Sequence, residues 1–160
     1  MIGDIMAEFS WKAIVLSAVA VVVVAAIAAP VPALAKAPAA RFTVNAAVGT
    51  VFDAYTKLTW QRGFGDLTYT WSAAKTYCKG LSLDGGGWRL PKLIELESIV
   101  DRAEKSPAID QTVFPATPAI QFWSATPYAG SASSAWCVQF AVGNSFNNSV
   151  SNVYRARCVR

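Results

Sequence analysis

Residues 70–81 read TWSAAKTYCKGL, and this stretch decides the fold. Thr70 carries the hydroxyl that an N-cap requires, so the sequence predicts a helix over residues 71–80. Four side chains recur at helical spacing and would share one buried face: Trp71, Ala74, Cys78 and Leu81. We therefore expect the first helix to be amphipathic and to hold a cysteine against the core.

The residues after this helix predict a glycine loop and then a second helix. Gly80 and the triple glycine at 85–87 end the first helix. Pro91 is typical of a helix start, and residues 92–101 are expected to form the second helix. Its apolar face would consist of three residues: Leu93, Leu96 and Val100.

Short β-type runs flank the helical region on both sides. Three runs precede it, at residues 42–44, 50–52 and 58–60, and two follow it, at 122–126 and 135–140. The order of strands, two helices and strands predicts an α+β domain and excludes a repeating βαβ arrangement.

The last part of the chain predicts one apolar strand face, a loop and a final strand. In residues 135–140, the following residues alternate with Cys137 and Gln139 and would form one apolar face: Trp136, Val138 and Phe140. Residues 143–152 hold four Asn and three Ser, so we predict a polar loop there. Residues 153–160 are expected to be the last strand.

An apolar leader precedes the domain. Residues 13–29 are uncharged and almost wholly apolar, and an Ala-x-Ala site ends at Ala35. We expect residues 1–35 to be a signal peptide, with an uncleaved signal anchor as the alternative. Residues 36–41 would be a linker and residues 42–160 the domain. Either alternative makes the domain secreted, periplasmic or cell-surface, with membrane contact only if the leader is retained.

The three cysteines allow three alternative disulfides. In an oxidising compartment one of these disulfides is expected to form. We favour Cys78 with Cys158, because one lies on the buried face of the first helix and the other in a final strand that must pair centrally. The bridge would tie the chain ends into one core. Cys137 would then be a buried thiol or an intermolecular link, which makes an oligomer possible.

Composition excludes several classes of chemistry. The chain has no histidine, so no Ser-His-Asp or Cys-His couple can form. Glu95 and Glu97 lie two apart on a helix and point to different faces, so they form no glycosidase pair. We therefore expect no enzyme activity, no metal and no cofactor. An exported domain without a basic-aromatic motif is also not expected to bind nucleic acid.

Two polar loops are the candidate binding surface, because Asn and Ser offer donors and acceptors to hydroxyl-rich ligands. They are residues 128–134 and 143–152, flanked by arginines in a stretch that holds no acidic residue from Gln111 onward. The candidate residues are Tyr128, Ser131, Ser133, Asn144, Phe146, Asn147, Asn148, Asn152, Arg155 and Arg157. The alternative is that Asn and Ser are simply common in loops.

Aromatic residues and Arg89 have a structural interpretation. Five tryptophans stand beside apolar or strand-forming residues and are expected in the core: Trp60, Trp71, Trp88, Trp123 and Trp136. Arg89, directly before Leu90-Pro91, is expected to donate hydrogen bonds to backbone carbonyls.

The chain contains an ordered series of motifs: Asp53-x-x-Thr56-x-Leu58-x-Trp60, Thr70-Trp71-x-x-Ala74-x-x-x-Cys78, Gly87-Trp88-Arg89-Leu90-Pro91-x-x-x-Glu95-Leu96, Phe114-Pro115, Phe122-Trp123-Ser124-Ala125-Thr126, Ala135-Trp136-x-Val138-x-Phe140, Gly143 and Arg157-Cys158-Val159-Arg160. This series resembles the Lcl C-terminal domain family, named for a collagen-like adhesin of Legionella. The resemblance implies a C-type-lectin-like fold in which a helix-1 cysteine bonds a last-strand cysteine. It also implies an exported, surface-exposed protein whose relatives bind polyanionic glycans, in some cases as trimers.

The chain departs from the family in two respects. It has no collagen-like Gly-X-Y stretch, so a trimer does not carry over. It also lacks the acidic triplets with which true C-type lectins ligate calcium. We therefore expect an adhesin-like module that recognises a glycan or other surface ligand without calcium.

Two further hypotheses stay open. One is a structural or protein-interaction subunit of the cell surface, whose partner is a surface protein. The other comes from Trp88-Arg89-Leu90-Pro91, which is similar to the formylglycine-generating enzyme superfamily. That enzyme needs a reactive cysteine pair, and the favoured bridge leaves only Cys137.

Overall fold

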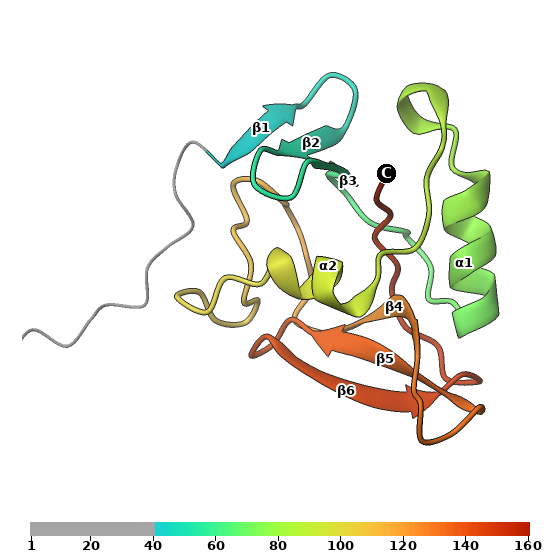
Figure 1. Ribbon diagram of the computed structural model, residues 1–160. Helices are drawn as coiled ribbons and strands as arrows, with labels where there is room; N and C mark the ends of the chain where they lie inside the picture. Colours follow the sequence, from blue (N-terminus) through green and yellow to red (C-terminus); the bar gives the residue numbers. More distant parts are fainter. Residues whose placement is uncertain (1–40) are drawn as a thin grey trace, which may run out of the picture. The chain divides into compact units, whose positions relative to one another are not determined.

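The computed structural model describes residues 41–160 and has an α+β fold (Figure 1). Its elements in chain order are β1 (Phe42–Asn45), β2 (Thr50–Asp53), β3 (Leu58–Gln61), α1 (Trp71–Gly80), the 3-10 turn η1 (Leu83–Gly85), α2 (Leu93–Ser98), β4 (Gln121–Pro127), β5 (Ser134–Gln139) and β6 (Asn144–Ser149). The predicted fold class is therefore confirmed. The predicted leader lies outside the described residues.

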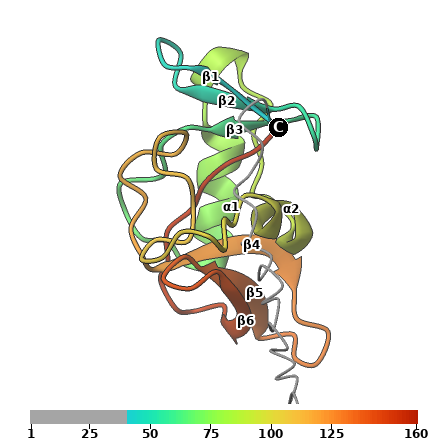
Figure 2. The same ribbon diagram turned by 90° about the vertical axis from the view of Figure 1, so that its left-hand side faces the viewer.

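Two antiparallel three-stranded sheets make up the β structure, in the orders β1-β2-β3 and β4-β5-β6. Figures 1 and 2 show them at opposite ends of the domain, with both helices and the carboxyl-terminal chain between them. Within residues 41–160, no helix is long and apolar enough to cross a membrane.

The first helix forms as the sequence predicts. The Thr70 hydroxyl accepts the Ala73 N–H at 3.4 Å, which satisfies one of the free donors of the first turn. Ala74 and Cys78 are fully buried, whereas Trp71 and Leu81 are half-buried. The apolar face therefore packs on the core through its two smallest members.

The second helix is shorter than predicted, at six residues rather than residues 92–101. The Glu95 carboxylate accepts the Lys92 N–H at 2.7 Å and so caps the amino end. At the other end the Asp101 N–H pairs with the Ala108 carbonyl at 3.0 Å, which draws the chain out of the helix. The apolar helical spacing in the sequence continues to Val100, but the hydrogen bond from Asp101 to Ala108 ends the helix earlier.

The predicted disulfide is confirmed. Cys78 and Cys158 are bonded over a sequence separation of 80 residues, and both are fully buried. They lie in a core cluster with Ala74, Trp88 and Trp123. A second cluster, around Trp60, Phe114 and Phe122, contains residues from both sheets and from α2. The bridge therefore joins α1 to the carboxyl-terminal chain inside the core.

The carboxyl-terminal segment, residues 153–160, is central but is not the regular strand that the sequence predicts. It makes isolated bridges: Tyr154 with Tyr69, Arg155 with Phe122, and Val159 with both Trp60 and Arg89. Because its partners come from both sheets and from the α1–α2 connection, the segment cannot keep one neighbour long enough to form a ladder.

Residues 143–152 are also not the loop that was predicted. Asn144–Ser149 form β6, which pairs along its whole length with β5. Gly143, at φ +74°, makes the tight turn that brings the strand back. The polar composition misled the prediction because β6 is an edge strand, where short polar side chains pair without a buried face.

The apolar face predicted for residues 135–140 is wrong in part. Cys137 is fully buried and Trp136 is half-buried, the reverse of the expected alternation at these two positions. Cys137 joins the disulfide cluster, whereas Val138 and Phe140 join the other one. The two faces of the sheet at β5 therefore contact different core clusters.

Candidate functional site

The predicted loop 128–134 is the connection between β4 and β5. The Tyr128 N–H donates to the Ser134 carbonyl at 2.9 Å and closes the turn. The Ser131 and Ser133 hydroxyls lie 2.9 Å apart and bond to each other. The Tyr128 ring meets Trp136 edge to face at 5.5 Å. Several polar groups of the loop are therefore hydrogen-bonded within the loop itself, and Tyr128 and Trp136 form an aromatic pair beside it.

Two of the predicted asparagines contact each other, because Asn152 donates to the Asn148 side-chain oxygen at 3.5 Å. The others are separated, because β6 directs successive side chains to opposite faces of the sheet. Asn144 and Asn147 are exposed and differ by an odd number of positions, so they lie on opposite faces. Phe146 is half-buried within the disulfide cluster. Asn148 donates to the Cys137 sulfur at 3.6 Å, and Asn152 donates to the Tyr154 hydroxyl at 3.2 Å.

Arg157 cannot belong to a surface site, and its prediction as a binding residue is wrong. The side chain is fully buried. Its Nε donates to the Gly63 carbonyl at 3.0 Å and its Nη2 to the Thr117 hydroxyl at 2.7 Å. Its guanidinium carbon lies 4.7 Å from the Phe114 ring centre. Burial lowers the pKa of Arg157 to about 9.

Arg155 is likewise engaged with the protein. It is half-buried and donates to the carbonyls of Gly65, at 3.1 Å, and of Asp66. Together with Arg157 it holds the chain that connects β3 to α1. Both arginines therefore attach the β3–α1 connection to the carboxyl-terminal segment.

Two more arginines are paired with acids. Arg41, which the sequence places in the linker, binds Asp53 through two hydrogen bonds of 2.9 and 2.6 Å. Burial alone would raise the pKa of Asp53, but hydrogen bonds from Arg41, Thr56 and the Tyr55 N–H hold it below its usual range. Arg160 pairs with Asp84 and lies over the Trp88 ring, 5.0 Å from its centre.

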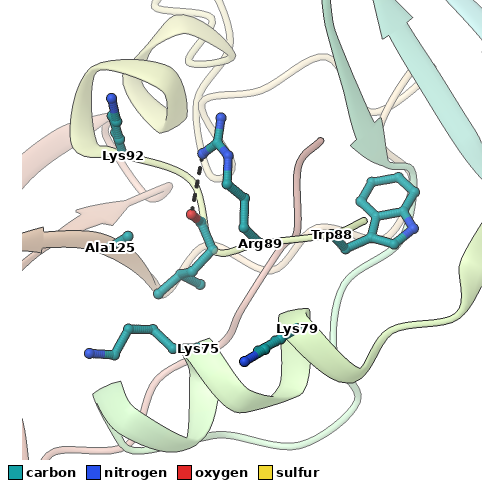
Figure 3. A pocket seen from close by; sticks show the side chains of 7 residues that line it. Lys75, Lys79, Trp88, Arg89, Lys92 and Ala125 are labelled. Carbon is teal, nitrogen blue, oxygen red and sulfur yellow. Dashed lines mark hydrogen bonds between the residues drawn. The ribbon is translucent and has the colours of Figure 1, made fainter. Parts of the chain in front are cut away.

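A pocket of about 330 Å³ lies between α1 and the segment 88–92 (Figure 3). The residues that line it are Lys75, Lys79, Trp88, Arg89, Leu90, Lys92 and Ala125. Four are cationic, three are apolar and none is acidic. An arrangement of this kind can hold a negatively charged group against an apolar surface.

The α1 wall of the pocket carries Lys75 and Lys79. Both are exposed, and their spacing of four residues puts them on the same side of the helix, one turn apart. Lys75 Nζ stands 3.4 Å from the centre of the Trp71 ring, a cation–π contact that orients this side chain. Figure 3 shows both lysines extending from α1 at the pocket.

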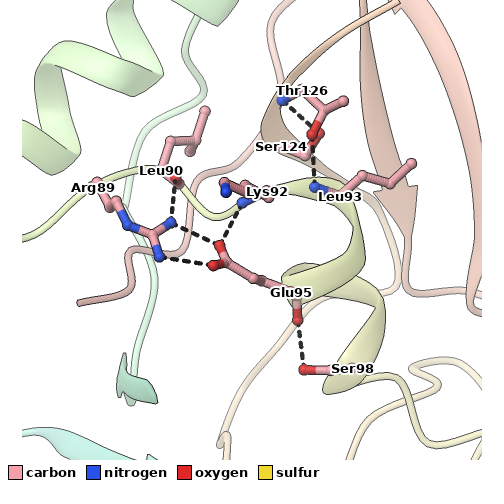
Figure 4. A network of polar contacts seen from close by, with 8 residues as sticks. All are labelled: Arg89, Leu90, Lys92, Leu93, Glu95, Ser98, Ser124 and Thr126. Atoms are coloured by element: carbon pink, nitrogen blue, oxygen red, sulfur yellow. Dashed lines mark hydrogen bonds and ion pairs between the residues drawn. The ribbon is translucent and has the colours of Figure 1, made fainter. Parts of the chain in front are cut away.

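A polar network fixes the opposite wall (Figure 4). The Arg89 guanidinium donates twice to the Glu95 carboxylate, at 2.7 and 2.8 Å. This pair holds the pKa of Glu95 below its usual range, although burial opposes it. The Leu93 N–H donates to the Thr126 hydroxyl at 2.9 Å, which attaches the wall to β4. Arg89 therefore acts mainly as the cation of an ion pair with Glu95. The backbone hydrogen bond expected for it is limited to the Leu90 carbonyl, at 3.5 Å.

Sequence reasoning missed this pocket, although it identified the segments that form it. The signal was the pair of lysines four residues apart on the helix surface, next to the motif Trp88-Arg89-Leu90-Pro91. The floor comes from Trp88 and Leu90, each 3% exposed. Trp60 and Trp123 are fully buried and Trp88 nearly so, as predicted, whereas Trp71 and Trp136 are only half-buried.

The remaining thiol is inaccessible in this fold. Cys137 is fully buried, and its sulfur donates to the Phe146 carbonyl at 3.3 Å. Burial raises its pKa, although the hydrogen bond from Asn148 opposes this. An intermolecular bond through this sulfur would require Cys137 to become exposed. The modifying-enzyme hypothesis needs an exposed thiol, and this one is not exposed.

Metal-ligating side chains do not gather within residues 41–160: no group of three or more His, Cys, Asp or Glu is placed to hold an ion.

Comparison with protein families matches residues 49–160 to the model of the Lcl C-terminal domain. The match covers both helices, the disulfide, five of the six strands in full and every lining residue of the pocket. No curated protein matches the chain.

Proposed function

The chain belongs to the Lcl C-terminal domain family, and from that premise we propose that it is a non-catalytic module that binds acidic glycans on a surface. The family and the buried disulfide indicate an extracytoplasmic protein, where such glycans are found. The pocket between α1 and the segment 88–92 is the proposed binding site.

One observation supports this function most strongly: the pocket combines several cations with an apolar floor and contains no acid. The ammonium groups of Lys75 and Lys79 supply charge to a carboxylate or sulfate. The apolar part of the lining offers a small surface to the C–H face of a sugar ring, chiefly at the half-buried Ala125, because Trp88 and Leu90 are each 3% exposed. Recognition of this kind uses ammonium groups directly and therefore requires no calcium.

The experiment is a binding assay on immobilised sialylated, sulfated and neutral glycans, with EDTA present throughout. The single variants Lys75→Gln and Lys79→Gln remove one charge each and keep the length of the side chain. Lys105→Gln is the matched control, because Lys105 is an exposed lysine outside the pocket lining.

We expect the wild type and Lys105→Gln to bind acidic glycans and not neutral ones. Each pocket variant should weaken binding about threefold to tenfold, the usual effect of losing one charge-assisted contact. Absence of binding to acidic glycans in EDTA, or equal binding by all four proteins, would contradict the proposal.

A second surface remains a candidate for the same function. The half-buried Trp136 stands opposite the exposed Asn147 in the β5–β6 pair, and Tyr128 packs on its edge. An aromatic ring beside an amide suits a neutral sugar. If Asn147→Ala abolishes binding and the lysine variants do not, this surface replaces the pocket.

A further inference from the structure

We propose that the domain contacts a lipid membrane through the end of the first sheet at which the chain enters it. We name this part of the molecule the entry surface, and it consists of Arg41, Thr43, Phe52, Tyr55 and Lys57. The proposal concerns the chain that keeps its leader, and it does not depend on the proposed glycan site.

Exposed aromatic side chains mark the entry surface. Within residues 41–160, eight large hydrophobic side chains are exposed, and the two aromatic ones among them, Phe52 and Tyr55, stand three residues apart. Tyr55, at 85%, is the most exposed of the eight, and Phe52 is 40% exposed. Single exposed apolar residues need no explanation, but a pair of aromatic rings at one end of a strand indicates a contact surface.

The sheet register places Phe52 between two hydroxyl side chains. Phe52 lies opposite Thr43 of β1 and Thr59 of β3. Because opposite residues of an antiparallel pair point to the same face, the three side chains form one row across the sheet. Thr43 is exposed and Thr59 is half-buried. An aromatic ring among hydroxyl groups suits the interfacial region of a bilayer, where apolar and polar groups meet.

The charge of this region matches anionic headgroups. Residues 41–61 contain one acid, Asp53, and two cations, Arg41 and Lys57. The Asp53 carboxylate is fully buried and binds Arg41, so it presents no charge at the surface. Lys57 is exposed and follows Tyr55 by two residues. Tyrosine is enriched at membrane–water interfaces, and an exposed lysine is attracted to anionic lipids.

Arg41 attaches the incoming chain to the entry surface. Its guanidinium carbon lies 4.6 Å from the centre of the Phe42 ring and 5.7 Å from that of the Tyr55 ring. Eleven residues, 30–40, separate Arg41 from the uncharged run of residues 13–29. A chain of eleven residues spans at most about 40 Å. A leader retained in a membrane therefore keeps the domain beside that membrane, and the entry surface is the part attached to it most directly.

A membrane explains the entry surface better than a second copy of the chain does. Two aromatic side chains, one of them less than half exposed, offer far less apolar area than the roughly 800 Å² per partner of a stable dimer. Contact at this end also leaves the rest of the domain accessible. The sheet β4-β5-β6 and the loop 128–134 lie at the opposite end (Figures 1 and 2).

The test uses the full chain in vesicles of phosphatidylcholine, with phosphatidylglycerol as the minor component. A polarity-sensitive fluorophore is attached at one introduced cysteine. Thr43→Cys carries it opposite Phe52, and Ala129→Cys carries it at an exposed position of the loop 128–134. The buried Cys137 stays unlabelled. Lipids with a nitroxide at the headgroup or in the upper acyl chain quench a fluorophore that touches the bilayer.

We expect the probe at position 43 to be quenched and its emission to shift to shorter wavelength, and the probe at position 129 to show neither effect. Absence of quenching at position 43, or equal quenching at both positions, would overturn the inference. Either result leaves the proposed function standing, because glycan binding is measured without vesicles.

A pair of double variants tests which side chains make the contact. Tyr55→Ser with Lys57→Gln should remove about half of the quenching at position 43 or more. Leu67→Ser with Lys105→Gln changes an exposed leucine and an exposed lysine elsewhere, and it should leave the quenching unchanged. Equal quenching in the two double variants would contradict the role of the entry surface.

The state of the leader is measured in membranes of the cells that produce the chain, by mass spectrometry of the intact protein. We expect the membrane fraction to contain the chain with residues 1–35 attached. A chain found only in the shorter form and released from the membrane would overturn the inference.

Discussion

Two groups of basic residues in this domain use the same charge in opposite ways. In the carboxyl-terminal segment, Arg155 and Arg157 donate to backbone carbonyls and a hydroxyl, and Arg157 is fully buried. Around the pocket, Lys75 and Lys79 are exposed and face no carboxylate among the lining residues. The first region supports the fold, whereas the second is open to a ligand.

This difference teaches that a local excess of arginine does not identify a binding surface. In the stretch after Gln111, which contains no acidic residue, the arginines donate to backbone carbonyls. These contacts cannot be read from the sequence. A planar guanidinium has five donors and can satisfy several carbonyls at once, so it suits interior positions. A lysine on a helix surface has fewer such partners and remains available.

The largest expected effect on stability comes from removing the disulfide that holds the carboxyl-terminal segment. Replacing both Cys78 and Cys158 with alanine removes a bridge that spans 80 residues. By the chain-entropy estimate, the free energy of unfolding should fall by roughly 4 kcal/mol. Denaturant unfolding measures it, and reductant should shift the wild type but not the variant. A loss below about 1 kcal/mol would show that the segment is held by its other contacts.

A slightly smaller loss is expected from Arg41→Met. It leaves the fully buried Asp53 carboxylate without its cation, which costs about 3 kcal/mol. The matched control is Arg41→Met with Asp53→Asn, where no charge remains to be compensated. The double variant should be the more stable of the two in thermal unfolding. Equal stability would mean that the ion pair contributes nothing.

The variant Arg157→Met tests whether the arginines of the carboxyl-terminal segment support the fold and not ligand binding. The Gly63 carbonyl and the Thr117 hydroxyl each lose a donor in the core, so we expect a loss of about 2 kcal/mol. Because Arg157 does not reach the surface, the affinity for an acidic glycan should be unchanged. A folded variant that has lost its binding would refute the assignment of Arg157 to the structural region.

Acid should weaken the ion pairs Arg41–Asp53 and Arg89–Glu95 in the same direction. Asp53 and Glu95 have folded pKa values below their ordinary values of 3.8 and 4.5. Their contribution is therefore complete above the ordinary values and is lost as the pH falls through the lower folded values. The melting temperature should be level from about pH 5 to 7 and fall below about pH 4. Arg41→Met should fall less steeply, and an identical profile would contradict this account.

The smallest effect on stability is expected at the pocket. Lys75→Gln and Lys79→Gln alter exposed side chains, so the free energy of unfolding should change by less than about 0.5 kcal/mol. Chemical denaturation of both variants beside the wild type provides the check. A loss of more than about 1 kcal/mol in either variant would place these lysines among the structural cations.

Much of the fold could be predicted because local signals agree with it. The Thr70 cap, the spacing from Ala74 to Cys78 and the bounds of the first three strands all depend on neighbouring residues. The disulfide followed from where the topology brings the ends of the chain. The carboxyl end of α2 was missed because its cause, the bond from Asp101 to Ala108, involves residues beyond the helical pattern.

The site was harder to predict because it depends on contacts between distant segments. The Asn/Ser-rich stretch forms β6, since its pairing with β5 outweighs its loop-like composition. The burial of Arg157 depends on Gly63 and Thr117, far away in the sequence. The pocket exists only because α1 lies beside the segment 88–92. From one sequence, the helix and the segment 88–92 can each be predicted, but not that they lie side by side.

The most direct measurement is the chemical-shift response of the backbone amides when 3′-sulfolactose or 3′-sialyllactose is added to the protein. This account predicts that the largest shifts occur at Lys75, Lys79, Ala125, residues 88–90 and Lys92, with little change at Arg157. Shifts confined to residues 128–134 and β6, or at no residue, would contradict it.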